Sequence, residues 1–180
     1  MKKIPMKHIG VGFISLFILM NLFFGLTPKL NSDKMPGIGK WRVLSVLTGS
    51  MTPMIDAGDM VIVARFEDAK PAVGDVVTFW QDQAKQSLIT HRVTQRLDNG
   101  FLETKGDANH EVDGGWTPPD LVVGKVVMTL PYAANLQKFI QHPFGYITVV
   151  LLCGYFIYRD KKRKEPKAIP NVQIIEEERI

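Results

Sequence analysis

The chain has 180 residues, which allows one domain of ordinary size plus anchoring segments. Its formal charge of +4 is uneven, because the two ends are basic while residues 28–143 hold twelve basic and thirteen acidic side chains. A central domain without a cationic excess argues against nucleic acid as a partner. The single cysteine, Cys153, excludes an intramolecular disulfide and a cysteine metal cluster.

The N-terminal segment has the sequence features of a membrane anchor. Residues 1–8 contain three lysines and no acid, and the uncharged apolar run Ile9–Leu26 follows them. Eighteen helical residues reach about 27 Å, close to the hydrocarbon thickness of a bilayer. A cleavable signal peptide is the alternative, but Thr27–Leu30 lacks a small-residue cleavage pattern. We predict a cytoplasmic N-terminus at 1–8 and a retained transmembrane anchor at 9–27.

A second apolar segment lies near the C-terminus. Phe144–Tyr158 carries no charge, and five basic residues follow within Arg159–Lys164. A buried C-terminal helix of a soluble domain is the alternative, but an abutting basic cluster is typical of a cytoplasmic membrane edge. We predict a second transmembrane helix at 141–158, followed by a cytoplasmic, disordered tail at 159–180.

Two spans with basic outer flanks define one topology. Both termini lie in the cytoplasm, and residues 28–140 form an extracytoplasmic domain. The sequence therefore predicts a multi-pass protein of the cell membrane with the lipid bilayer as a partner.

The central domain shows β rather than helical periodicity. Short runs of β-branched and apolar residues alternate with turn signals, and Asp98-Asn99-Gly100 is typical of a hairpin. The expected strands are 60–66, 75–80, 88–96, 101–105 and 121–130, the last of them broken by Gly124. We predict a mainly β, compact, barrel-like domain between the two helices.

Ser50 is the candidate nucleophile. Gly49 permits a tight bend and a close approach of another chain, while Pro53 stiffens the following segment. An exposed, fixed hydroxyl in such a turn suits nucleophilic chemistry. An ordinary surface turn is an equally good reading of this pattern alone.

A serine nucleophile needs a base. His91 lies in the middle of an expected strand and would be held rigidly, whereas His110 lies in an acidic loop. A strand histidine can also be a packed structural residue. Lys105, at the end of an expected strand, is a competing base, because a desolvated lysine can be deprotonated.

A carboxylate usually orients such a histidine. The loop 106–115 offers Asp107, Glu111 and Asp113 for this role. A solvated turn and a calcium loop are alternatives, but the spacing does not match an EF-hand. We expect no metal ion and no cofactor.

Four segments of the chain form a recognisable set. They are Thr48-Gly49-Ser50-Met51-Thr52-Pro53 with Gly58-Asp59, Gly74-Asp75-Val76-Val77, Thr90-His91-Arg92-Val93, and Gly106-Asp107-Ala108-Asn109 with Asp113. Together they resemble the type I signal peptidases, in the histidine-using branch typical of the endoplasmic reticulum, archaea and some spore-forming bacteria. They occur in the order of that family and cover about residues 41–130.

The resemblance implies a Ser–His–Asp mechanism that cleaves signal peptides from exported preproteins. Ser50 would be the nucleophile, His91 the base and Asp113 the orienting acid, with Asp107 in a supporting role. Thr48 stands where the family often has serine, and its hydroxyl would join the Ser50 backbone N–H in stabilising the oxyanion.

Two other functions remain open at this point. The chain could be a membrane-tethered β-domain that binds exported proteins without catalysis, or a Ser–Lys protease that uses Lys105.

Overall fold

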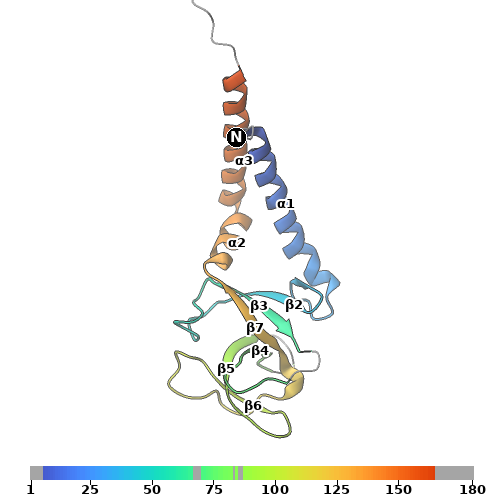
Figure 1. The fold of residues 1–180 in the computed structure, drawn as a ribbon, viewed down its shortest axis with the longest axis vertical. Coiled ribbons are helices and arrows are strands. Elements are labelled where there is room, and N and C mark those ends of the chain that lie inside the picture. Colours follow the sequence, from blue (N-terminus) through green and yellow to red (C-terminus); the bar gives the residue numbers. More distant parts are fainter. Residues whose placement is uncertain (1–5, 67–69, 83, 85–86, 165–180) are drawn as a thin grey trace, which may run out of the picture.

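A computed structural model describes residues 6–66, 70–82, 84 and 87–164. Figure 1 shows a β-domain with its helices on one side. The elements are α1 (Met6–Leu30), β1 (Gly37–Ile38), β2 (Trp41–Ser45), β3 (Met60–Arg65), β4 (Val76–Trp80), β5 (Leu88–Arg96), β6 (Leu102–Lys105), a 3₁₀ turn (Pro119–Leu121), β7 (Val122–Leu130), α2 (Ala133–Gln141) and α3 (Pro143–Lys164). The predictions for residues 1–5 and for the tail from 165 to 180 lie outside the described residues.

The strands form a single antiparallel sheet in the order β1-β2-β3-β7-β4-β5-β6. The mainly β prediction is confirmed. The barrel-like part of that prediction is not supported, because the sheet stays open with β1 and β6 at its two edges. The two-residue β1 pairs only with β2 in this sheet, so the described strands do not close on themselves.

The five expected strands occur within about a residue of their predicted bounds, but β1 and β2 were not predicted. In β2 an inward-facing position is occupied by Arg42, which is buried and bonded to Asp33 at 2.7 Å. A charge at a core position hides the alternation that would have marked this strand. The expected break at Gly124 is wrong, since β7 runs through it. A Cβ there would overlap the backbone of Ala64 in β3, so glycine permits the close approach.

The core consists of two clusters divided by the sheet. Neighbouring residues of β4 contribute to different clusters, since Val76 packs in the first and Val77 in the second. Successive strand residues point to opposite faces, so β4 is covered on both sides. The first cluster also contains Met51 and Ile55, which follow the candidate nucleophile.

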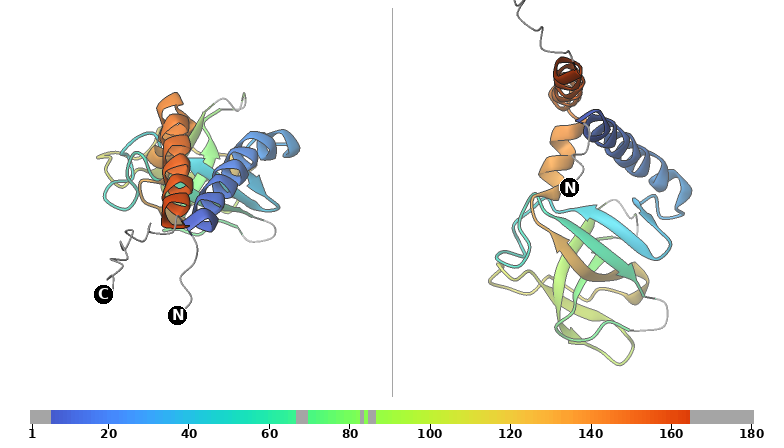
Figure 2. Two further views of the ribbon diagram at one scale, coloured as in Figure 1. Left: turned by 90° about the horizontal axis from the view of Figure 1, so that it is seen from above. Right: turned by 45° about the horizontal axis from the view of Figure 1, so that its top comes forward.

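The helices lie together on one side of the sheet, and α1 packs against α3 (Figure 2). Phe17 meets the ring of Tyr146 edge-on at 5.1 Å, and the Tyr146 hydroxyl donates to Asn21 Oδ1 at 3.1 Å. Among the described helices, α1 alone is long and apolar enough to cross a membrane, over Gly10–Leu30. Helices α2 and α3 meet at a bend of 84°, and only the two together are long and apolar enough to cross a membrane. Both membrane segments and the domain boundaries therefore stay predictions.

Candidate active site

Ser50 lies in a turn that the hydrophobic core holds in place. Thr52 N–H donates to the Gly49 carbonyl at 3.1 Å, and Ile55 N–H donates to the Met51 carbonyl at 3.0 Å. Met51 and Ile55 are 2% and 1% exposed. Burial of these two side chains fixes the backbone on which Ser50 sits, while Ser50 itself remains partly accessible.

The Ser50 turn also packs directly on the acidic loop. The Ser50 carbonyl accepts a hydrogen bond from Ala108 N–H at 2.9 Å. A Cβ at Gly106 would lie 2.6 Å from the same carbonyl oxygen, so only glycine fits without a backbone shift. The glycine of the expected Gly-Asp segment therefore permits contact between two parts of the site.

His91 occupies the middle of β5, where it pairs with Val77 of β4 and is 8% exposed. Its Nε2 lies 3.0 Å from Ser50 Oγ, and its Nδ1 lies 2.6 Å from Asp113 Oδ2. We assign the proton to Nδ1, because a carboxylate accepts but cannot donate when ionised. This tautomer leaves Nε2 free to accept the proton of the Ser50 hydroxyl.

Asp113 lies in the loop after β6 and is bonded at two points to Thr104. Asp113 N–H donates to the Thr104 carbonyl at 2.8 Å, and the Thr104 hydroxyl donates to Asp113 Oδ2 at 2.6 Å. The sequence reasoning did not find Thr104. The available signal was its place on the inward side of β6, two residues before the Gly-Asp segment.

Asp107, the second candidate carboxylate, has a different partner. It accepts two hydrogen bonds from Arg92, at 2.8 Å from Nε and 2.6 Å from Nη2. Hydrogen bonding to Asp107 raises the pKa of the Arg92 guanidinium. Arg92 also donates to the Gly74 carbonyl at 2.9 Å, so this pair joins the acidic loop to the turn before β4.

Lys105, the competing base, lies on the other side of β6. It pairs with Arg92 in the sheet register, and cross-strand partners share a face. Thr104, its neighbour, faces the His91 side. In the structure the nitrogen within hydrogen-bonding distance of Ser50 Oγ therefore belongs to His91.

The remaining acidic-loop residues are exposed. His110 and Glu111 point to solvent. Across residues 6–66, 70–82, 84 and 87–164, no group of three His, Cys, Asp or Glu side chains could hold a metal ion.

Ser50 and His91 border a cleft of about 710 Å³. Its walls come mainly from two stretches of chain, the end of β2 with the residues after it and the beginning of β5, while Val61 of β3 and Asn109 of the acidic loop complete the lining. The lining side chains are mostly apolar and include Leu44, Val46, Leu47, Ile55, Leu88 and Ile89. Thr48 also lines this cleft, beside Ser50. A substrate in the cleft would thus meet the hydroxyl of Ser50 directly.

A serine hydroxyl, a histidine and a carboxylate joined in one hydrogen-bonded series beside a cleft have the arrangement that is typical of triad serine hydrolases. No protein-family model matches the chain. Signal peptidase I W from Bacillus subtilis (strain 168) is 37% identical over 82 residues, which is 43% of this chain and 42% of that protein. The signal peptidase complex catalytic subunit SEC11C from Homo sapiens is 33% identical over 130 residues, 65% of this chain and 67% of that protein. SEC11 from Metarhizium robertsii is 28% identical over 120 residues, 61% of this chain and 63% of that protein.

The chain belongs to the type I signal peptidase family, a family of serine endopeptidases. It spans less than half of the Bacillus protein and about two thirds of the human subunit. The resemblance inferred from the four sequence segments is thereby confirmed.

Proposed function

We propose that this chain is a membrane-anchored serine endopeptidase that removes signal peptides from exported preproteins through an acyl-enzyme, as the histidine-using branch of the family does. One observation carries the proposal. Ser50 Oγ, both ring nitrogens of His91 and Asp113 Oδ2 form a continuous hydrogen-bonded series with steps of 3.0 and 2.6 Å.

The mechanism follows from that order of groups. Ser50 Oγ attacks the scissile carbonyl carbon while His91 Nε2 takes the hydroxyl proton, and Asp113 stabilises the resulting imidazolium. The tetrahedral intermediate collapses, the C–N bond breaks, and His91 returns its proton to the leaving amine. A water molecule, deprotonated by the same nitrogen, then attacks the acyl-enzyme and releases the cleaved signal peptide.

The oxyanion formed in the first step needs hydrogen-bond donors. We assign this role to the backbone N–H of Ser50 and the hydroxyl of Thr48, which borders the same cleft. Loss of one such donor typically lowers the rate about 10²–10³-fold. Thr48→Val is therefore expected to slow acylation without affecting the His91–Asp113 contact.

The cleft supports a peptide as substrate. Its two main walls are short segments of chain, and we expect an extended peptide to lie between them. Leu44, Val46 and Ile89 give the walls an apolar surface. Such a surface accepts apolar side chains, whereas a charged side chain buried there would have no partner.

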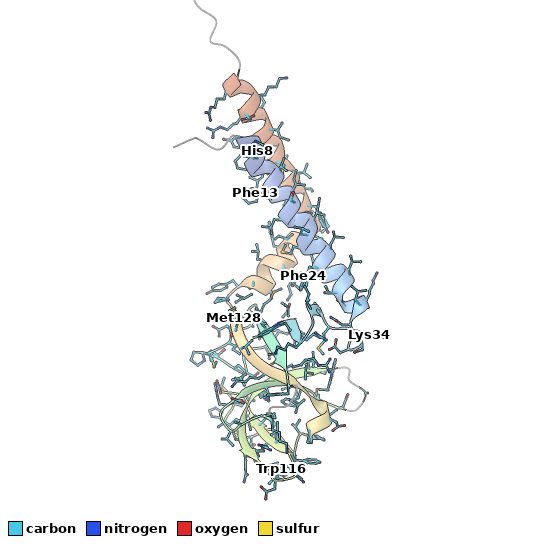
Figure 3. The ribbon with its side chains drawn as sticks, turned by 45° about the vertical axis from the view of Figure 1, so that its right-hand side comes forward. His8, Phe13, Phe24, Lys34, Trp116 and Met128 are labelled. Atoms are coloured by element: carbon cyan, nitrogen blue, oxygen red, sulfur yellow. The ribbon has the colours of Figure 1, made fainter. Side chains whose placement is uncertain are left out.

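An apolar groove supports a location at a bilayer surface. Phe23 of α1, Ile38 of β1 and Trp41 of β2 line it, and its volume is about 550 Å³. The sheet register continues this surface across three strands, since Val43 pairs with Ile62 and Ile62 pairs with Met128. Figure 3 places Met128 on the side of the β-domain that faces the helices, and Trp116 at the far end.

An apolar face that is continuous with an apolar helix is favoured at the edge of the hydrocarbon layer, where water would otherwise contact it. We place α1 and residues 141–158, which include the apolar part of α3, in the membrane and the β-domain on its extracytoplasmic side. The positively charged outer flanks of the two segments support this orientation.

The decisive experiment compares precursor processing in cells that carry Ser50→Ala, His91→Ala or the wild-type chain. Both variants are expected to accumulate unprocessed preproteins while membrane insertion and expression persist. Ser32→Ala, which removes an exposed hydroxyl outside the cleft, is the matched control and should process normally. Full processing by Ser50→Ala would overturn the proposal.

A serine-reactive acylating probe separates the proposed enzyme from the two alternatives. Labelling of Ser50 in the wild-type chain is expected, and its complete absence would favour a domain that only binds exported proteins. Lys105→Ala is expected to label normally. Loss of labelling in Lys105→Ala, together with retention in His91→Ala, would transfer the role of base to the lysine.

A further inference from the structure

Thr104 contacts the acid of the triad through both its side chain and its backbone. It is 1% exposed and lies in β6. Its hydroxyl is 2.6 Å from Asp113 Oδ2, the same oxygen that lies 2.6 Å from His91 Nδ1. Its carbonyl accepts the Asp113 N–H at 2.8 Å. Two donors therefore converge on one carboxylate oxygen.

Asp113 requires such support because no strand or helix holds it. It lies in a loop, and its side chain is 24% exposed, so water can compete for its oxygens. Thr104, by contrast, lies in a strand paired with Val93 of β5. Its branched side chain has restricted χ1 rotation, which burial restricts further. Because the strand holds this hydroxyl in place, its hydrogen bond can restrict the position of the Asp113 carboxylate in the loop.

We propose that Thr104 is a positioning residue of the triad, which fixes the rotamer of Asp113 and thereby the orientation of His91 toward Ser50. This inference rests on the proposed peptidase function. The hydroxyl also donates a hydrogen bond to the ionised carboxylate and partly compensates its negative charge. Thr104 does not line the cleft, so it acts on turnover and not on substrate binding.

Thr104→Val tests this role, because valine keeps the size and branching of threonine and removes the donor. With full-length protein in detergent and a signal-sequence peptide, kcat is expected to fall about 10- to 100-fold, because small misplacements of catalytic groups cause rate losses of this size. KM is expected to change less than about 2-fold. The acidic limb of the kcat/KM profile should move to higher pH, because Asp113 then carries more uncompensated charge beside the imidazolium.

Two further variants separate positioning from general stability. Thr104→Ser retains a donor and is expected to recover most of kcat and the wild-type acidic limb. Thr78→Val is the matched control, because Thr78 is fully buried in β4, which is separated from β6 by β5, and hydrogen-bonds at 2.9 Å to Thr90, not to the triad. It should lower the melting temperature without moving the acidic limb. If Thr104→Val does not fold, the Thr104→Ser variant still tests the proposal through its kcat and its pH profile.

The outcomes distinguish this inference from the proposed function. A wild-type chain that neither cleaves the peptide nor reacts with the acylating probe defeats the peptidase itself. An active wild-type chain whose Thr104→Val variant keeps kcat and the acidic limb overturns the role of Thr104 alone. So does a Thr104→Val variant that behaves like Thr78→Val, or a Thr104→Ser variant that recovers neither quantity.

Discussion

At the scale of single residues, two carboxylates of one loop have separate tasks. Asp113 contacts His91, whereas Asp107 is bonded to Arg92, whose other donor reaches the Gly74 carbonyl. The first contact bears on proton transfer and the second on the connection between two loops. The two aspartates should therefore respond differently to the same substitution.

Asp113→Asn is expected to lower kcat about 10³- to 10⁴-fold, because an amide facing Nδ1 favours the wrong imidazole tautomer. Its melting temperature should change little. Asp107→Asn is the matched variant and is expected to retain kcat within about 3-fold. Its free energy of unfolding should fall by only about 0.5–1 kcal/mol, because the ion pair between Asp107 and Arg92 is partly exposed. Peptide kinetics and thermal unfolding measure both effects. Inactivation by Asp107→Asn at an unchanged melting temperature would contradict this division.

Motif order was enough to predict the residues that now form the hydrogen-bonded series, Ser50, His91 and Asp113. It left open which aspartate faces His91, since loop residues carry no periodicity that fixes their direction. Thr104 was not predicted, because its inward position two residues before the Gly-Asp segment is equally compatible with an ordinary structural residue of a strand. Its contact with Asp113 arises only when the loop folds back on β6.

At the scale of elements, the turn that carries Ser50 and the loop after β6 depend on each other. Gly106→Ala would bring a methyl group to 2.6 Å from the Ser50 carbonyl and close to the Asn109 side chain. We expect the Ser50 turn to shift and the acylation rate to fall about 10²-fold. Gly114→Ala is the control, since a Cβ there has open space around it. An unchanged acylation rate in Gly106→Ala would show that the two segments are not coupled.

The turn before β4 is joined to β7 by an ion pair that responds to pH. Asp75 Oδ1 lies 2.6 Å from Lys125 Nζ. Burial opposes ionisation of Asp75, but hydrogen bonds from Lys125 and from Ala72 N–H outweigh it, so its pKa lies below the usual value. A carboxyl whose pKa is lowered by folding stabilises the fold fully above its unfolded pKa of about 4, and this contribution is lost as the pH falls further, through the lower pKa of the folded state.

Asp75→Asn should therefore lower the free energy of unfolding by about 0.5–1 kcal/mol at pH 7, a small value because Lys125 is largely exposed. The difference from the wild-type chain should be smaller at pH 3 than at pH 7. Unfolding in denaturant at the two pH values measures it. An equally large difference at pH 3 would mean that Asp75 acts through its shape and not its charge.

Strand prediction succeeded where inward positions are apolar and failed where they are not. The periodicity of β5 gave its bounds from Leu88 to Arg96, but Arg42 in β2 broke the pattern. The strand sequences also did not indicate that the sheet is open. One of its edges is formed by β1, whose two residues are too few to show a periodicity.

At the scale of the whole molecule, the β-domain is joined to α1 by charged contacts. Asp33, just after α1, accepts hydrogen bonds from Arg42 at 2.7 Å and from Arg65 at 3.3 Å. These bonds tie the segment after the anchor to β2 and β3. In the proposed topology these bonds would restrict the distance between the membrane and Ser50, as expected for the proposed cleavage of substrates held in the same bilayer.

The proposed topology can be tested by cysteine labelling, because Cys153 is the only cysteine in the sequence. In a Cys153→Ala background, Asp98→Cys would place a thiol in the exposed turn between β5 and β6, and Lys161→Cys would place one beyond the apolar part of α3. A membrane-impermeant maleimide applied to intact cells should label the first variant and not the second. Permeabilised cells should show labelling of both, which controls for thiol reactivity. Labelling of Lys161→Cys in intact cells would mean that α3 does not cross the bilayer, and α1 would then be the single anchor.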